Sequence, residues 1–198
     1  QKYVMRILKA QIPETVQFEA VMQTKLADGH IGTAQYLKLS TGGYVGEQNG
    51  TFFTLSKRIQ GTVPKTASLE LVRNFGVTLA RFHSSLEGLV VPRSKMQWFD
   101  PANAKQDLDT YGGIDREVLA ALINKGDVLF GLDLPKAVIH GDLWLGNVFT
   151  DGDRLTAVFD METAENTVRI IDLARTYLSM KLETHHPAPA PIQLLLEG

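Results

Sequence analysis

Three polar side chains interrupt an otherwise apolar segment between Ala137 and Phe149, whose sequence is AVIHGDLWLGNVF. They are His140, Asp142 and Asn147, and they follow a short run that is typical of a buried strand. Polar groups are costly to bury unless they bind a partner. Their types and their spacing therefore mark this segment as the part of the chain where we expect chemistry.

A predicted β-hairpin follows this segment and brings another carboxylate toward it. Residues 148–150 are typical of a strand, Asp151-Gly152 of a tight turn, and RLTAVFD of a return strand that ends at Asp160. In an antiparallel hairpin, the residue that enters the first strand lies beside the residue that leaves the second. We therefore expect Asn147 to lie near Asp160.

Asp142 precedes Asn147 in the same loop, so these two side chains are expected to converge with Asp160 at the open end of the hairpin. Two carboxylates and one amide make a hard, oxygen-only site of the kind that binds Mg²⁺. Such a site suits phosphoryl transfer, in which a metal bridges phosphate oxygens and a metal-free carboxylate deprotonates the acceptor hydroxyl. An isolated aspartate after a strand is commonly a turn former or a helix cap. The presence of Asp142 and Asn147 is what favours a metal role for Asp160.

Two further residues are expected to support the loop. His140 follows an apolar strand, so we expect its ring to bond backbone groups and not to act as a general base. Asp172 lies in the apolar, helix-like segment RIIDLARTYLSM, where an unpaired charge would be costly, so we expect it to accept hydrogen bonds from the loop backbone. Glu162 and Glu165 are expected on the loop surface, with a role near the metal left open.

The composition is that of an ordinary folded protein. The chain has 198 residues, 20 Lys and Arg against 22 Asp and Glu, a net charge of -2 and no Cys. We expect one large domain or two small lobes, without nucleic acid or a membrane as partner and without thiolate metal sites. No apolar stretch is long enough for a membrane span, so a cytoplasmic location is expected, and nothing indicates the oligomeric state. The start at Gln1 is expected to be that of a fragment or a trimmed chain.

The elements that must position these residues fall into two parts. The first contains the strand KYVMRILKA, the helix PETVQFEAVMQTKLADG, and the strands AQYLKLS, GGYVGEQ and TFFTLSKRI. Asn49-Gly50, between the last two strands, is the strongest hairpin signal in the chain. A helix with one apolar stripe then runs from Ser68 to Gly88.

We therefore predict an α+β, two-lobed fold. The N-terminal lobe, residues 1–61, would be a small antiparallel sheet with one helix. The C-terminal lobe, residues 62–198, would be mostly helical and would carry the hairpin with the candidate site. It includes a polar, irregular segment from Pro92 to Gly113 and a helical pattern in DREVLAALINKGDVLF.

The segments VIHGDLWLGNVF and LTAVFDMETAENTVRIIDLA, with the two-lobed layout, resemble the aminoglycoside phosphotransferase family. These small-molecule kinases have a protein-kinase-like fold and include choline, homoserine and fructosamine kinases. The resemblance covers most of the chain and runs more weakly through RFHSSL back to YVMRILK. It implies that Asp142 is the catalytic base, that Asn147 and Asp160 are the metal ligands, and that His140 and Asp172 support the catalytic loop.

The same resemblance assigns residues to nucleotide binding. Arg6 falls where the family's strand usually presents a lysine to the nucleotide phosphates, and Glu19 falls where the partner helix supplies the acid that holds that cation. The segment LSKRIQG resembles the hinge. Backbone groups of Lys57, Arg58 and Ile59 would then meet the adenine.

The sequence departs from the family pattern in three places. Arginine at position 6 keeps the charge but is not a neutral replacement for lysine, and Lys2, on the same face of the strand, is the alternative cation. The family's phosphate-covering loop would precede Tyr3, and its acceptor-binding helices would continue beyond Gly198. We therefore expect a chain that is complete enough to fold and incomplete as an enzyme.

Together these features predict an ATP-dependent, Mg²⁺-requiring kinase that phosphorylates a hydroxyl of a small polar molecule. A nucleotide-binding pseudokinase or regulatory module remains open, as does a metal-dependent phosphoester hydrolase, which would need further His or Asp ligands. Trp144 is expected either to wall the acceptor pocket or to pack. HGDLW resembles fructosamine kinases and NTVRIIDLA resembles homoserine-kinase-like members, so the resemblance leaves the acceptor open. His185 and His186 are expected in a flexible connector.

Overall fold

The computed structural model describes residues 2–8, 13–92, 116–184 and 190–197. Almost all of the predicted irregular segment from Pro92 to Gly113, and both His185 and His186, lie outside these residues. The elements are, in order, β1 (Tyr3–Leu8), α1 (Pro13–Asp28), β2 (Gly46–Gln48), β3 (Thr51–Lys57), α2 (Leu69–Ser85), α4 (Arg116–Phe130), β4 (Lys136–Ile139), the 3₁₀ turn η1 (Leu145–Asn147), β5 (Val148–Asp151), β6 (Arg154–Val158), the 3₁₀ turn η2 (Met161–Thr163), β7 (Glu165–Val168), α5 (Ile170–Thr184) and α6 (Ala190–Glu197).

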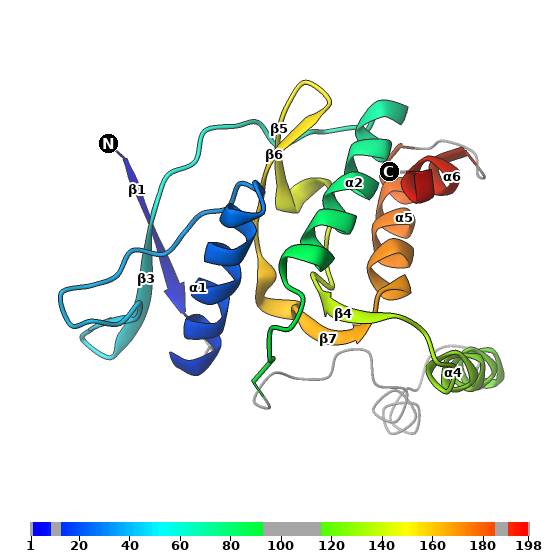
Figure 1. Ribbon diagram of the computed structural model, residues 1–198, viewed down its shortest axis with the longest axis horizontal. Coiled ribbons are helices and arrows are strands. Elements are labelled where there is room, and N and C mark those ends of the chain that lie inside the picture. Colours follow the sequence, from blue (N-terminus) through cyan, green and yellow to red (C-terminus); the bar gives the residue numbers. More distant parts are fainter. Residues whose placement is uncertain (1, 9–12, 93–115, 185–189, 198) are drawn as a thin grey trace.

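The first sheet contains β1, β3 and β2 in that order, with both pairings antiparallel. Asn49 and Gly50 join β2 to β3 with φ angles of 53° and 75°, which confirms the predicted hairpin because such angles are needed in the tightest turns. In Figure 1, α1 lies between this sheet and the elements that surround α2. This arrangement and the mixture of helices with antiparallel sheets confirm the predicted α+β class.

The prediction of a strand over AQYLKLS is wrong. Tyr36 forms only an isolated bridge with Ser56, and the backbone N–H of Leu37 donates to the carbonyl of Leu55 at 2.7 Å. The chain then turns back at once, because the N–H of Leu39 donates to the carbonyl of Gly43 at 2.8 Å. Pairing over two residues is too short to make a strand, although it adds to the edge of β3.

The candidate loop is framed by two strand pairs. β4 pairs with β7, and β5 pairs with β6 through a two-residue turn at Gly152 and Asp153, one residue later than predicted. The β5–β6 register contains an irregularity: Phe149 lies opposite Ala157, whereas Thr150 lies opposite Leu155. The hairpin therefore carries a β-bulge, a feature that changes the direction of a strand and occurs often beside functional sites.

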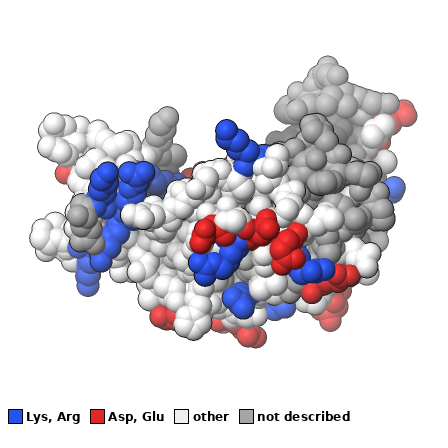
Figure 2. Space-filling model, turned by 90° about the horizontal axis from the view of Figure 1, so that it is seen from above, with Lys and Arg blue, Asp and Glu red and all other residues white. Residues whose placement is uncertain are grey.

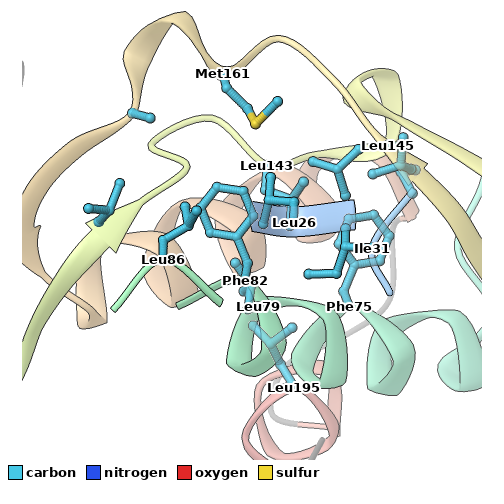
Figure 3. Packing of buried hydrophobic residues seen from close by; sticks show 14 of the residues in the cluster. Leu26, Ile31, Phe75, Leu79, Phe82, Leu86, Leu143, Leu145, Met161 and Leu195 are labelled. Carbon is cyan, nitrogen blue, oxygen red and sulfur yellow. The ribbon is translucent and has the colours of Figure 1, made fainter. Parts of the chain in front are cut away.

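The core lies around α2, and its residues come from both parts of the chain (Figure 3). Ser68, at the predicted start of the helix, is its N-cap, because its side chain accepts a hydrogen bond from the N–H of Leu71 at 3.0 Å. The side chains drawn around α2 come from α1, from the candidate loop and from α6, so that the loop is held by apolar packing as well as by hydrogen bonds. The labelled members are Leu26, Ile31, Phe75, Leu79, Phe82, Leu86, Leu143, Leu145, Met161 and Leu195.

Backbone contacts also tie the first part of the chain to the hairpin. The N–H of Val158 donates to the carbonyl of Gly32 at 2.9 Å, beside a parallel bridge between Thr33 and Val158. Further along, a Cβ on Gly61 would lie 2.5 Å from the side chain of Phe149, so that this position accepts only glycine without movement. The connection after β3 therefore runs directly against β5.

Charged side chains of both signs lie side by side on the surface seen in Figure 2. Arg73 lies 3.4 Å from Glu70 and 3.5 Å from Glu197, and Arg154 lies 3.9 Å from Asp151. Pairs as exposed as these contribute little to stability. Among the described residues, no helix is long and apolar enough to cross a membrane.

The packing around α2 yields a prediction about stability. Leu79 is 1% exposed, whereas Leu69, at the start of the same helix, is 46% exposed. Leu79→Ala should lower the free energy of unfolding by about 2–5 kcal/mol because it leaves a cavity. Leu69→Ala is the matched control and should change it by no more than about 0.5 kcal/mol. Urea unfolding followed by circular dichroism measures both, and equal effects would contradict the description of the core.

Candidate active site

One buried carboxylate organises the loop that carries the candidate catalytic residues. Asp172, in the first turn of α5, is fully buried. Its Oδ2 accepts a hydrogen bond from the N–H of His140 at 2.8 Å, and its Oδ1 accepts one from the N–H of Gly141 at 2.8 Å. The Nε2 of His83, on α2, donates a third to Oδ2 at 2.8 Å. These bonds compensate the buried charge, and the two backbone donors are those expected from the sequence.

The ring of His140 holds two backbone segments together. Its Nε2 lies 2.8 Å from the carbonyl oxygen of Phe159, and the N–H of Asp142 donates to its Nδ1 at 3.3 Å. A carbonyl can only accept, so the partners assign the proton to Nε2 and leave Nδ1 as an acceptor. Burial lowers the pKa of His140, although Asp172 and the Phe159 carbonyl act in the opposite direction. The ring is therefore neutral and has the structural environment expected from the sequence.

Glycine is required between His140 and Asp142. Gly141 has a φ of 80°, and a Cβ there would lie 2.8 Å from the carbonyl oxygen of Thr163. The hydroxyl of Thr163 also donates to the carbonyl of His140 at 2.9 Å. The candidate loop is thus closed against η2, the turn that follows Asp160.

The hairpin brings Asn147 beside Asp142 and, through the backbone, beside the residue that precedes Asp160. The Asn147 Nδ2 donates to the carbonyl oxygen of Asp142 at 2.8 Å and lies 3.3 Å from its Oδ2. The N–H of Phe159, directly before Asp160, donates to the carbonyl of Asn147 at 2.9 Å. The two ends of the hairpin are therefore joined by a backbone bond next to the site.

Asn147 and Asp160 offer oxygen atoms of the kind that binds a divalent cation. Asn147 uses its Nδ2 on Asp142, which leaves the amide Oδ1 as an acceptor, and Asp160 is half exposed with a left-handed backbone at φ 56° and ψ 58°. Such backbone conformations are costly and gather at functional sites. Among the described residues, no group of three His, Cys, Asp or Glu could hold a metal. A metal here would need the amide oxygen together with water or phosphate oxygens, which is how Mg²⁺ is commonly held.

Arg6 connects the sheet to this site. Its Nη1 lies 3.4 Å from the Glu19 Oε2 and 3.1 Å from the Tyr36 hydroxyl. Its Nη2 lies 2.7 Å from the Glu162 Oε2 and 3.7 Å from the Asp160 Oδ1. The predicted pair of Arg6 and Glu19 is therefore present, and Glu162, which was expected on the surface, is half exposed and bound to Arg6.

Tyr36 completes this cluster. Its hydroxyl donates to the Glu19 Oε2 at 2.6 Å and accepts from Arg6. Burial and the Glu19 carboxylate raise the pKa of Tyr36, so the phenol stays protonated. Burial acts against the charge of Arg6, but Tyr36, Glu19 and Asp160 raise its pKa. A cavity of about 330 Å³ opens beside the cluster, and its lining includes Ser56 and the segment from Phe159 to Glu162.

The predicted hinge lies at the end of β3. Lys57 pairs with Tyr3, and the N–H of Arg58 donates to the carbonyl of Lys2 at 3.0 Å. The side chains of Lys57 and Arg58 are exposed, and Ile59 is half-buried. These residues lie beyond Ser56, outside the lining described for the cavity beside Arg6.

The structure also locates Lys2 and Trp144, two residues whose roles the sequence left open. Lys2 lies before β1 and is exposed, whereas Arg6 is the residue that contacts Glu19. Trp144 is half-buried, and its ring packs so closely on Gly146 that a Cβ there would lie 2.5 Å away. The expectation of an exposed Glu165 is wrong: it lies in β7 opposite Ile139 and is buried.

Three residues of the site were not predicted from the sequence. His83 binds Asp172, Tyr36 binds Glu19, and the Nη2 of Arg175 lies 2.9 Å from the Oδ1 of Asp142. A polar His83 on the apolar stripe of a helix was a usable signal, because buried polar groups need partners. Arg175 follows Asp172 by one helical turn, which places both on the same face of α5.

The neutral ring of His140 makes the fold sensitive to acid. Its lowered pKa means that the unfolded chain binds a proton at higher pH than the folded chain does. The free energy of unfolding should therefore be constant above about pH 6.5 and should fall below it, by at most about 1.4 kcal/mol per pH unit from this residue. Urea unfolding at pH 7.5 and 5.5 measures the loss, which should be smaller in His140→Gln. An equal loss in both proteins would contradict this assignment.

Comparisons with known proteins agree with this geometry. A model of the phosphotransferase enzyme family matches residues 1–195. The chain is 26% identical over 187 residues to the homoserine kinase of Zymomonas mobilis subsp. mobilis, covering 89% of this chain and 58% of that protein. It is 26% identical over 179 residues to the homoserine kinase of Bradyrhizobium diazoefficiens, covering 87% and 53%. The chain thus spans little more than half of the length of these curated relatives.

Solved structures show the same fold. Amicoumacin kinase hAmiN, in complex with AMP-PNP, Ca²⁺ and Ami, superposes with a TM-score of 0.79 at 16% identity, covering 99% of this chain and 65% of that one. An aminoglycoside phosphotransferase from Alicyclobacillus acidocaldarius superposes with a TM-score of 0.68 at 15% identity, covering 98% and 66%. The family model, the relatives and the fold agree with the motifs around Asp142 and Asp160, and the chain belongs to the phosphotransferase enzyme family.

Proposed function

We propose that this chain forms the nucleotide-binding and catalytic part of an ATP-dependent kinase that transfers the γ-phosphoryl group to a hydroxyl of a small polar molecule. The observation that carries the proposal is that Asn147 contacts Asp142 and is joined through the backbone to Phe159, directly before Asp160. Family membership and the homoserine kinase relatives support it. Nucleotide binding is assigned to residues 1–61 and the transfer step to residues 62–198.

Asp142 is the proposed catalytic base. Its carboxylate would accept a hydrogen bond from the acceptor hydroxyl, orient that hydroxyl toward the γ-phosphorus and take its proton as the new P–O bond forms. The backbone of the loop is held by Asp172, His83 and His140, so the carboxylate does not need to be repositioned when the substrates bind. The support for this role is its place beside Asn147, together with the motif.

Asn147 and Asp160 are the proposed ligands of a divalent cation, with Mg²⁺ as the expected ion. When bound, the ion would neutralise charge on the phosphate oxygens during transfer. A solved neighbour of similar fold contains AMP-PNP and Ca²⁺, which supports the use of a nucleotide with a divalent metal. Asp160 is half exposed and within 3.7 Å of Arg6, so a cationic partner already lies beside it.

Arg6 is the proposed phosphate-binding cation, and Glu19 with Tyr36 holds its guanidinium from one side. The charge-assisted bonds of a guanidinium suit phosphate oxygens. Backbone groups of Lys57, Arg58 and Ile59 remain the proposed contacts of the adenine. The N–H of Arg58 is occupied by Lys2 in this structure, so a nucleotide would have to use the neighbouring backbone groups or displace that bond.

The proposal is tested by ATP consumption of the full-length protein with Mg²⁺ across amino alcohols, hydroxy acids, sugars and aminoglycosides. Asp142→Asn should lower the acceptor-dependent rate by about 10²–10⁴-fold because the base is lost. Asp160→Asn should lower it by at least a similar factor and should weaken the response to Mg²⁺. Asp151→Asn, at the exposed tip of the hairpin, is the matched control and should leave the rate unchanged.

Other outcomes of this test point to other functions. Nucleotide binding without turnover of any acceptor, unchanged in Asp142→Asn, would support a pseudokinase or regulatory module. Release of phosphate from phosphoesters without nucleotide would support a hydrolase. A normal rate in Asp142→Asn would contradict its role as the base, whatever the acceptor.

The choice between Arg6 and Lys2 has a test of its own. Arg6→Met should raise the KM for ATP by roughly tenfold or more, because it removes charge-assisted bonds to phosphate. Lys2→Met removes the same charge from an exposed position before β1 and should leave the KM unchanged. Steady-state kinetics at saturating acceptor measure both, and the reverse result would transfer the role to Lys2.

A further inference from the structure

The hydroxyl of Tyr36 lies between the two charged partners of the Arg6–Glu19 pair. It is 2.6 Å from the Glu19 Oε2 and 3.1 Å from the Arg6 Nη1. The direct contact between that Nη1 and the Glu19 Oε2 is longer, at 3.4 Å, whereas a well-formed N–H···O bond is about 2.9–3.0 Å long. The phenol therefore makes a shorter contact with each partner than the partners make with each other, and much of the hold of Glu19 on Arg6 passes through it.

The backbone of Tyr36 is fixed independently of its hydroxyl. Its N–H donates to the Oε1 of Gln23 at 2.8 Å, and the residue forms a bridge with Ser56 of β3. Gln23 follows Glu19 by one turn of α1, and both are buried. One face of this helix thus holds the main chain of Tyr36 as well as its hydroxyl. Removal of the hydroxyl alone should therefore leave the backbone in place.

The guanidinium of Arg6 is shared between two sides of the cavity of about 330 Å³. Its Nη1 faces Tyr36 and Glu19. Its Nη2 lies 2.7 Å from the Glu162 Oε2 and 3.7 Å from the Asp160 Oδ1. A planar guanidinium can serve both sides through separate nitrogens, whereas a lysine has only one. Tyr36 gives Nη1 an acceptor without a further negative charge, so it suits an arginine at this position.

We propose that Tyr36 is a positioning residue for phosphate binding, because it fixes Nη1 and thereby directs the Nη2 of Arg6 toward the place where nucleotide phosphates would bind. This inference rests on the proposed function, since it takes Arg6 to be the phosphate-binding cation. Without the hydroxyl, Nη1 is left with the long contact to Glu19, while two carboxylates attract Nη2 from the other side. The cation would then have to be ordered when the nucleotide binds, which lowers the affinity.

The test measures nucleotide binding and does not depend on turnover. Isothermal titration calorimetry of the full-length protein with Mg²⁺ compares AMP-PNP with adenosine, which lacks the phosphates. Tyr36→Phe should weaken AMP-PNP binding by about 3–10-fold, as expected for one lost hydrogen bond, and should leave adenosine binding unchanged. Arg6→Met should weaken AMP-PNP binding by roughly tenfold or more. The double variant should bind no more weakly than Arg6→Met alone, because Tyr36 acts through Arg6.

Tyr44→Phe is the matched control, since it removes the same hydroxyl from a half-buried tyrosine that lines a separate cavity with Gly43 and Phe52. It should bind AMP-PNP as the unaltered protein does. An unchanged affinity in Tyr36→Phe, an equal loss for adenosine, or a loss that adds in full to that of Arg6→Met would each overturn the inference. Weaker binding in Arg6→Met without any change in Tyr36→Phe would refute the role of Tyr36 alone. Normal binding in Arg6→Met would refute the proposed role of Arg6 as well.

Discussion

The buried carboxylate of Asp172 is the interaction on which the candidate site depends. Two consecutive loop N–H groups and the ring of His83 donate to it, so three separate elements meet at one charge. A buried carboxylate without these donors would be strongly unfavourable. The loop therefore cannot change its path without leaving the charge unpaired, and the positions of Asp142 and Asn147 follow from that constraint.

Much of this site could be predicted from the sequence, because its central residues are close together in the chain. A strand, a loop and a hairpin between His140 and Asp160 determine which side chains converge, and the apolar surroundings of Asp172 indicate a buried acceptor. Contacts between distant segments were not predictable in this way. Tyr36 was assigned to a strand that does not form, and nothing local showed that Glu165 would be covered when β7 pairs with β4.

The two parts of the chain are joined by charge as well as by backbone. Arg6, from the first sheet, has acidic partners on both sides: Glu19 on α1, and Glu162 and Asp160 after β6. Its position therefore depends on the balance between these carboxylates. In the proposed function, phosphate oxygens and a divalent cation would compete for the same charges, so nucleotide binding would be coupled to the relative placement of the two parts.

The bulge in the β5–β6 hairpin has a consequence for how this protein can vary. With regular pairing from the turn onward, Asn147 would lie opposite Val158; the extra residue, Thr156, moves its partner to Phe159. Because side chains alternate along a strand, adding or removing one residue here would turn Asp160 to the other face. A one-residue insertion or deletion between β5 and Asp160 would therefore misplace this carboxylate, whereas a substitution that keeps the length of the hairpin would leave its register intact.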